Sequence, residues 1–274
     1  KGVILEAKLK LTKIKGDILK VKTEKFYSIN QMTTLFSNYS KNSNYMGAWI
    51  DHFSKKGIGI FKCAKWCKRN QKYTNYLPKK KKISYIRRLI YFLFNNIIIS
   101  RLLIIIFNKL LMLISYKSTR YQSFYDFYYP QEKFLPNESM LFKEGKVNIQ
   151  IIIPEKKFFI VMDKIFKLTK EYKFESWWLG LKKHLRQNYL NVFALDGYDI
   201  TLQWSKNYIK KNSFKLFKKK LFNIIHLYNC KIYLTQDISM NSQEINKIYN
   251  FKNFRSNKNK IFSNLLSDRI LGNK

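Results

Sequence analysis

The alternating segment Asp196–Trp204 carries side chains suited to contact a hydroxylated ligand. In an extended strand, Asp199, Thr201 and Gln203 point to one face about 7 Å apart, and the apolar residues between them point to the other. An acid, a hydroxyl and an amide on one face could line a site for a substrate rich in hydroxyl groups. The same alternation is also typical of a sheet face covered by water, so the pattern alone leaves both interpretations open.

A second strand with polar side chains on one face is predicted at Lys146–Pro154, where Asn148 and Gln150 share a face. Buried amides need hydrogen-bond partners, so a substrate or cofactor edge is plausible beside them. Trp49 follows the small pair Gly47-Ala48 and could form the wall of a pocket. A tryptophan in such a context is more often a core aromatic.

The composition is strongly basic, with 53 Lys and Arg against 17 Asp and Glu and a formal net charge of +36. Hydrophobic residues make up 46%, which is too apolar for a disordered chain. The charge suggests a nucleic acid or an anionic membrane as partner. However, the lysines are spread along the chain, and no RNA-binding or zinc-knuckle spacing occurs. We therefore expect no specific nucleic-acid partner.

Cysteine and histidine are too sparse to predict a metal site. The side chains concerned are Cys63, Cys67, Cys230, His52, His184 and His226. The first two cysteines lack a second Cys or His pair, so no metal is expected, and free thiols suit a reducing cytoplasm. The histidines are scattered, and none is expected to pair with an acid at catalytic spacing. Gly-rich phosphate loops, HExxH and a serine nucleophile elbow are also missing from the sequence.

Residues 89–115 form the most apolar part of the chain. A membrane-spanning helix needs about 20 nearly uncharged residues, whereas polar residues interrupt this run. Arg101 would lie near the middle of the bilayer, at a cost of about 2.5–3.5 kcal/mol on insertion scales. The pattern favours a buried or membrane-touching amphipathic segment.

Periodicity predicts an α+β fold, in which helices flank an antiparallel sheet. We expect strands over 5–11, 146–154, 174–181, 196–204 and 231–237. We expect helices over 29–36, 157–172, 213–229 and 242–250, with a closing segment over 261–271.

Several motifs, in the same order along the chain, resemble the C-terminal part of the FAD-linked oxidases of the vanillyl-alcohol-oxidase superfamily. The resemblance is closest to decaprenylphosphoryl-β-D-ribose 2′-oxidases and more distant to D-arabinono-1,4-lactone oxidases. The motifs are Gly2–Ala7, Ala48–Asp51, Phe107-Asn108, Phe127–Pro130, Gln150–Pro154, Leu181-Lys182, Gly197–Leu202, Tyr233–Asp237 and Phe262–Arg269.

The resemblance implies a division of the chain between two domains. Residues 1–14 would be the last strand of an FAD-binding domain, and 15–230 a substrate-binding cap domain with a lid at 89–115. Residues 231–274 would return to the FAD-binding domain and pack there. The half that binds the flavin pyrophosphate would lie outside these residues. The chain is therefore expected to be a fragment, half of a split enzyme or a decayed relative, with a separate flavin-domain chain or a reductase as a possible partner.

The resemblance also assigns residue roles. It implies catalytic roles for Gln236 and Thr201, and substrate contacts for Trp49, Tyr128, Asn148, Lys182 and Asp199. Gln150, Tyr233 and Gln236 would contact the cofactor. Four residues depart from the family pattern: Gln236 replaces a lysine near the flavin, Asp199 an asparagine, Asn148 a glutamine, and Thr201 a small or thiol residue.

The function implied is FAD-dependent oxidation of a secondary alcohol by hydride transfer to the flavin. The substrate would be a polyprenylphosphoryl-ribose-like sugar or a sugar lactone. One alternative is a catalytically inactive module that binds a sugar lipid or a partner chain. A second alternative is a basic protein of the membrane surface or of nucleic acid. The expected location is the cytoplasm, with peripheral contact to the inner face of the membrane.

Overall fold

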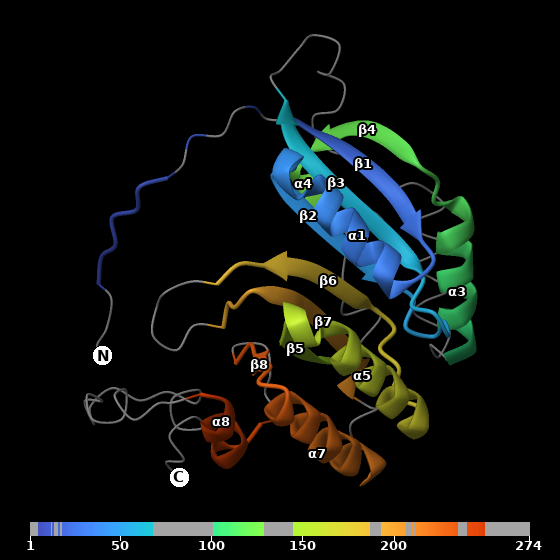
Figure 1. The fold of residues 1–274 in the computed structure, drawn as a ribbon, viewed down its shortest axis with the longest axis vertical. Helices are drawn as coiled ribbons and strands as arrows, with labels where there is room; N and C mark the ends of the chain where they lie inside the picture. The colour runs from blue at the N-terminus through green and yellow to red at the C-terminus, as the bar shows by residue number, and fades with distance from the viewer. Residues whose placement is uncertain are drawn as a thin grey trace.

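The computed structural model describes residues 5–11, 13, 16, 18–67, 101–128, 145–186, 193–206, 210, 212–234 and 240–249. An eight-stranded sheet with the order β4-β1-β3-β2-β6-β7-β5-β8 runs through these residues, and each recorded strand pair is antiparallel (Figure 1). The strands are β1 Ile18–Phe26, β2 Tyr45–Ile50, β3 Gly59–Cys67, β4 Ser118–Ser123, β5 Lys146–Pro154, β6 Leu179–His184, β7 Gly197–Ser205 and β8 Lys231–Ile232.

Helices pack on both faces of this sheet. They are α1 Ile29–Tyr39, α3 Arg101–Ile114, α4 Phe124–Tyr128, α5 Phe158–Tyr172, α7 Asn212–Leu227 and α8 Ser242–Ile248, with 3₁₀ turns η1 Ser40–Asn42 and η5 Glu155–Lys157. Helices α1, α5 and α7 cover one face, which we call the helix face (Figure 1). We call the opposite face the second face; α3 and α4 pack against parts of it.

The main core lies between the sheet and the helix face. It is rich in aromatic contacts, such as Phe36 with Phe61 at 5.0 Å and Phe158 with Tyr198 at 4.4 Å between ring centroids. Strands β5 and β7 contribute their apolar side chains to it, because alternate residues of a strand point to the same face. Their polar side chains must therefore lie on the second face, among them Asp199.

The α+β class with an antiparallel sheet is confirmed. Helices were predicted over 29–36, 157–172, 213–229 and 242–250, and they occur as α1, α5, α7 and α8. Ser28 caps the first of these by accepting a hydrogen bond from the Gln31 backbone N–H. The strand predicted at 146–154 is β5, with the same bounds.

The strand predicted over 174–181 was misplaced, since β6 spans Leu179–His184. Tertiary hydrogen bonds hold the preceding residues instead. The Phe174 N–H donates to the Thr169 carbonyl, and the Ser176 N–H donates to His52 Nδ1. Backbone groups used in this way are not available to a strand ladder, so the strand begins later.

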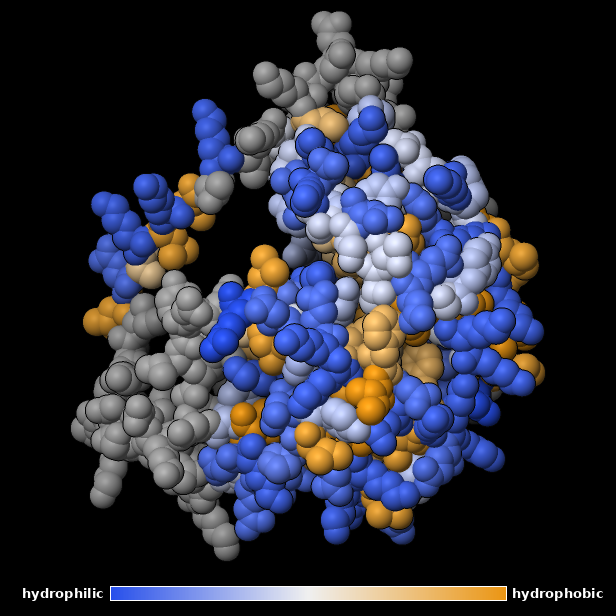
Figure 2. Space-filling model, in the orientation of Figure 1, coloured by the Kyte–Doolittle hydropathy of each residue, from blue (hydrophilic) through white to orange (hydrophobic). Residues whose placement is uncertain are grey.

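The strand expected over 5–11 is absent from the structure. These residues pair with no described strand, and Leu5, Leu9 and Leu11 are exposed, along a segment that stands apart from the main body in Figure 2. An isolated strand has no partner for its backbone groups, which explains why none forms. The assignment of 1–14 to a flavin domain stays a prediction.

Residues 231–274 are expected to return to a flavin domain, and that assignment stays a prediction. Strand β8 pairs with β5, and Ile232, Met240, Ile245 and Tyr249 lie in the main core. The described residues 231–234 and 240–249 therefore pack on this sheet. The expected segment 261–271 lies outside the described residues.

The apolar run 89–115 contains α3, which has 14 residues; residues 89–100 lie outside the described part. Among the described helices, none combines the length and the apolar character that crossing a membrane requires. In α3, Asn108 and Met112 are buried, whereas Leu110 and Leu113 are exposed. The expectation of a buried or membrane-touching amphipathic segment stays a prediction. Its role as a lid stays a prediction.

Candidate functional site

Most of the residues predicted to form the site lie on the second face, in three neighbouring rows across the strands, and the central row holds four of them. Trp49 is opposite Gly180, Gly180 is opposite Thr201, and Thr201 is opposite Gln150. The row continues to Tyr233, whose backbone N–H donates to the Gln150 carbonyl at 2.9 Å. Strand pairing thus gathers residues that are far apart in the sequence.

Two neighbouring rows add the other predicted residues. Lys182 is opposite Asp199 on one side of the first row, and Asn148 is opposite Gln203 on the other side. Directly opposite residues share a face and have Cβ atoms about 4.5–5.5 Å apart. An acid, a base and amides therefore lie within the reach of one small ligand.

Asp199 is the centre of this group and is only 2% exposed. Its Oδ2 accepts a hydrogen bond from Gln150 Nε2 at 2.5 Å and lies 3.2 Å from His184 Nε2. The sequence-based expectation that no histidine pairs with an acid was wrong. The β6–β7 pairing brings the two side chains together, a contact that spacing along the chain does not reveal.

Buried polar atoms in this group have no hydrogen-bond partner within the described part of the chain. They are Asp199 Oδ1, Asn148 Oδ1 and Trp49 Nε1. Buried polar groups in native proteins are almost always satisfied by protein, water or a ligand. Lys182 is exposed beside Asp199, and among the described residues no carboxylate forms an ion pair with its amine. Two buried oxygens of the group therefore lack a donor, and one buried N–H lacks an acceptor.

Two glycines leave the middle of the second face without side chains. Gly180 lies between Trp49 and Thr201, and Gly47 lies on the adjacent strand. A Cβ added at either position would meet its nearest atom only at 3.7 Å. Packing does not require these glycines, but they keep the backbone of the sheet accessible between the polar side chains.

Trp49 has a double role. It is buried, and it packs with Ile60, Met112 and the ring of Trp178, whose centroid is 6.1 Å away. The core interpretation of Trp49 is therefore confirmed. The unpartnered Nε1 of the same side chain lies on the second face, so a role in ligand contact stays a prediction.

Tyr128 does not join this group in the structure. Tyr128 is half exposed on α4, and its ring contacts Tyr45 at 6.2 Å and Phe124 at 4.9 Å between centroids. This aromatic cluster lies over the β1–β3–β2 part of the sheet. Gln236 lies outside the described residues.

Aromatic rings border the site at the end of β6. Phe193 packs edge-on against His184, with 6.0 Å between centroids, and in a tilted arrangement against Tyr233, with 5.2 Å between centroids. Neither His184 nor Phe193 was predicted as a site residue. A usable signal existed for His184, because it is two residues after Lys182 and so shares its face in a strand.

Among the described residues, no cluster of side chains could serve as the ligands of a metal ion. Across the described ranges, no three His, Cys, Asp or Glu side chains come close enough to hold an ion. Cys63, Cys67 and Cys230 are free thiols, and burial raises the pKa of Cys230 to about 12.

No protein-family model matches this chain, and no curated protein matches it. The resemblance to FAD-linked oxidases therefore stays a hypothesis that rests on the motifs.

Proposed function

We propose that the second face is the substrate wall of an FAD-dependent oxidoreductase that oxidises a secondary alcohol of a sugar. The observation that carries this proposal is the set of buried, unpartnered atoms Asp199 Oδ1, Asn148 Oδ1 and Trp49 Nε1 on one sheet face. These two acceptors and one donor complement the hydroxyl groups of a sugar and the ring N–H of a flavin beside it. The nearby glycines leave room for such a ligand to reach the sheet.

The residues present fit a flavin at one end of this face. An isoalloxazine ring offers an N–H donor and several acceptor atoms along one edge, and the Asn148 amide can both accept and donate. Gln150 and Tyr233 would lie beside the ring, and Gln236 would join them as the family resemblance implies. Bound FAD would supply the acceptor for the hydride of the sugar C–H bond.

The chain's own residues would bind and orient the sugar. Asp199 Oδ1 would accept a hydrogen bond from a sugar hydroxyl, and Thr201 would contact the same group. Lys182 would pair with a substrate phosphate, since its ammonium group is exposed and is next to the site. Trp49 would contact the apolar face of the sugar ring. Oxidation of an alcohol also releases the hydroxyl proton. Asp199 would receive it first, and His184, whose Nε2 lies 3.2 Å from Asp199 Oδ2, is the next base beside it.

A flavin absorbance spectrum is the first test. The purified chain would be mixed with FAD, alone and together with a flavin-domain chain from the same source. The proposal expects a bound flavin whose absorbance bleaches when a sugar substrate is added. In that case Gln236→Lys, which restores the charge of the family lysine, is expected to speed the bleaching.

The alternative of an inactive binding module makes a different prediction in the same experiment. A folded chain that binds a sugar phosphate but leaves the flavin spectrum unchanged would support the module and would contradict the oxidoreductase. A chain that binds neither flavin nor sugar would contradict both.

A further inference from the structure

Helix α3 has an exposed apolar side that no other described element covers. The side chains on this outer side are Leu102, Ile106, Phe107, Leu110, Leu113 and Ile114, which are 45% to 75% exposed. They fall within an arc of about 140° on a helix with 3.6 residues per turn. In Figure 2 hydrophobic atoms gather at the right margin of the molecule, where Figure 1 places α3.

The inner side of α3 is fixed to the protein, so the apolar side cannot turn inward. Asn108 is buried and its Nδ2 donates to Asp51 Oδ1 at 2.8 Å. Met112 packs with Trp49. At the first residue of the helix, Arg101 forms an ion pair with the buried Glu175. These contacts set the rotation of the helix about its axis.

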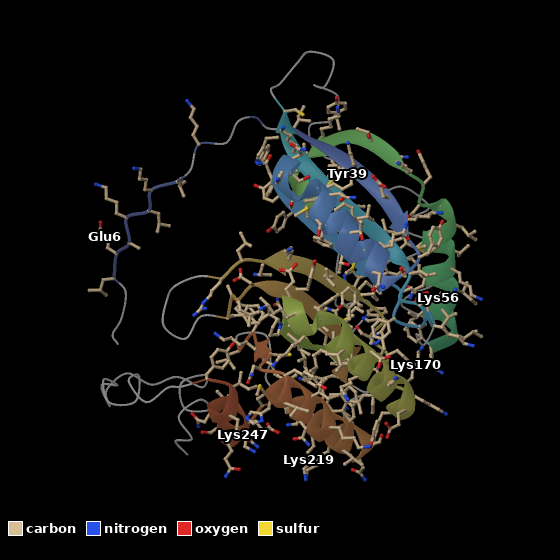
Figure 3. All side chains as sticks on the ribbon, viewed as in Figure 1. Glu6, Tyr39, Lys56, Lys170, Lys219 and Lys247 are labelled. Carbon is tan, nitrogen blue, oxygen red and sulfur yellow. The ribbon has the colours of Figure 1, made fainter. Side chains whose placement is uncertain are left out.

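Several basic side chains belong to α3 or to segments connected to it. Lys109 is on α3 itself, and Lys117 follows the helix. Lys55 and Lys56 are in the turn between β2 and β3, which the hydrogen bond from Asn108 to Asp51 links to α3. In the view of Figure 3, the Lys56 label lies next to α3. The sequence of α3 contains no Asp or Glu. An exposed apolar strip with a positive border complements a surface of negative headgroups over acyl chains.

We propose that α3 docks this protein on an anionic bilayer, with its apolar side among the acyl chains and its lysines at the headgroups. With 14 residues, the helix suits a position in the plane of the interface. The same charges disfavour pairing of α3 with a second copy, because two positive borders would repel each other. This inference does not depend on the proposed oxidoreductase function.

Vesicle flotation of the full chain tests the proposal. The vesicles would contain phosphatidylcholine, either alone or mixed with phosphatidylglycerol, at low and high salt. We expect Leu110→Glu/Leu113→Glu to lower partitioning into the mixed vesicles at least tenfold. The matched control is Leu216→Glu/Leu227→Glu, which places the same charges at exposed leucines of α7. It should bind like the wild type.

The comparison separates specific docking from attraction due to the net charge. A general charge effect would weaken binding equally in both double variants and would vanish at high salt, and that outcome would overturn the proposal. Unchanged binding of the α3 variant, or no binding by the wild type, would also overturn it. So would a wild-type oligomer that becomes monomeric in the α3 variant without vesicles, because α3 would then join copies of the chain.

Discussion

The Gln150 side-chain amide donates a hydrogen bond of 2.5 Å to Asp199 across the paired strands β5 and β7. This bond holds the carboxylate in one orientation, with Oδ2 occupied and Oδ1 free of partners among the described residues. A carboxylate that is buried and half satisfied is costly unless something else completes it. The pair therefore positions the site for a ligand donor.

Replacing Asp199 with Asn should weaken ligand binding while preserving the fold. The amide has the same shape, but it loses the charge that strengthens a hydrogen bond from a sugar hydroxyl. Hydrogen bonds to charged groups are worth about 1.5–3 kcal/mol, so we expect a loss of roughly 10- to 100-fold in sugar affinity by calorimetry. Asp163→Asn, on the surface of α5, is the control and should leave affinity unchanged. Equal affinities for both variants would contradict the assignment.

Gly180→Leu should block the site without unfolding the protein. A Cβ at Gly180 meets nothing closer than 3.7 Å, whereas one at Gly59 would lie 2.0 Å from the Trp49 carbonyl oxygen. We therefore expect Gly180→Leu to keep its melting temperature but lose sugar binding. Gly59→Ala should destabilise the protein, with a lower melting temperature by calorimetry. If Gly180→Leu still bound sugar at wild-type affinity, the ligand would not lie over this part of the sheet.

The alternation of residues along β5 and β7 was enough to predict both strands and their polar faces. It could not give the register between strands, which decides what lies beside Asp199. Pairing of β6 with β7 places Lys182 opposite Asp199 and so brings His184 within 3.2 Å of the acid. This contact depends on the tertiary fold, and that is why the histidine was missed.

The environment of α3 shows a second limit of sequence patterns. The apolar run predicted an amphipathic segment, but its buried side is defined by Asn108, which contacts a residue 57 positions away. An asparagine in an apolar helix is usually expected at the surface. The hydrogen bond to Asp51 satisfies the buried amide of Asn108, and the residues near Asn108 in the sequence do not predict this partner.

The Asn108–Asp51 hydrogen bond should contribute measurably to stability. Asn108→Ala removes the side-chain donor to the buried Asp51 Oδ1. The Phe53 backbone N–H, at 3.1 Å, is then the donor that remains among the described residues. Removing a partner from a buried polar group costs about 1–3 kcal/mol. Urea unfolding should show a loss in this range, whereas Asn30→Ala, at an exposed position of α1, should show much less. Equal losses would mean that the buried hydrogen bond adds nothing specific.

His52 should make the protein sensitive to mild acid. The imidazole is fully enclosed; its Nδ1 accepts from the Ser176 N–H at 2.9 Å, so its own proton lies on Nε2, facing Thr169 Oγ1 at 2.9 Å. Burial lowers the pKa of His52 to about 3, with Lys170 adding to the effect. Protonation would also destroy the bond from Ser176. The folded state therefore prefers the neutral ring.

The direction of the pH effect follows from the two pKa values. Between about 6.5, the ordinary pKa, and about 3, the unfolded chain binds the proton and the folded chain does not, so stability falls as the pH falls. The contribution of His52 should be complete above pH 6.5 and decline by at most about 1.4 kcal/mol per pH unit below it. His52→Gln should reduce this slope in urea unfolding, whereas His226→Gln, at an exposed position of α7, should keep it. If both variants kept the wild-type dependence of the unfolding free energy on pH, the carboxylates and not His52 would account for the acid sensitivity.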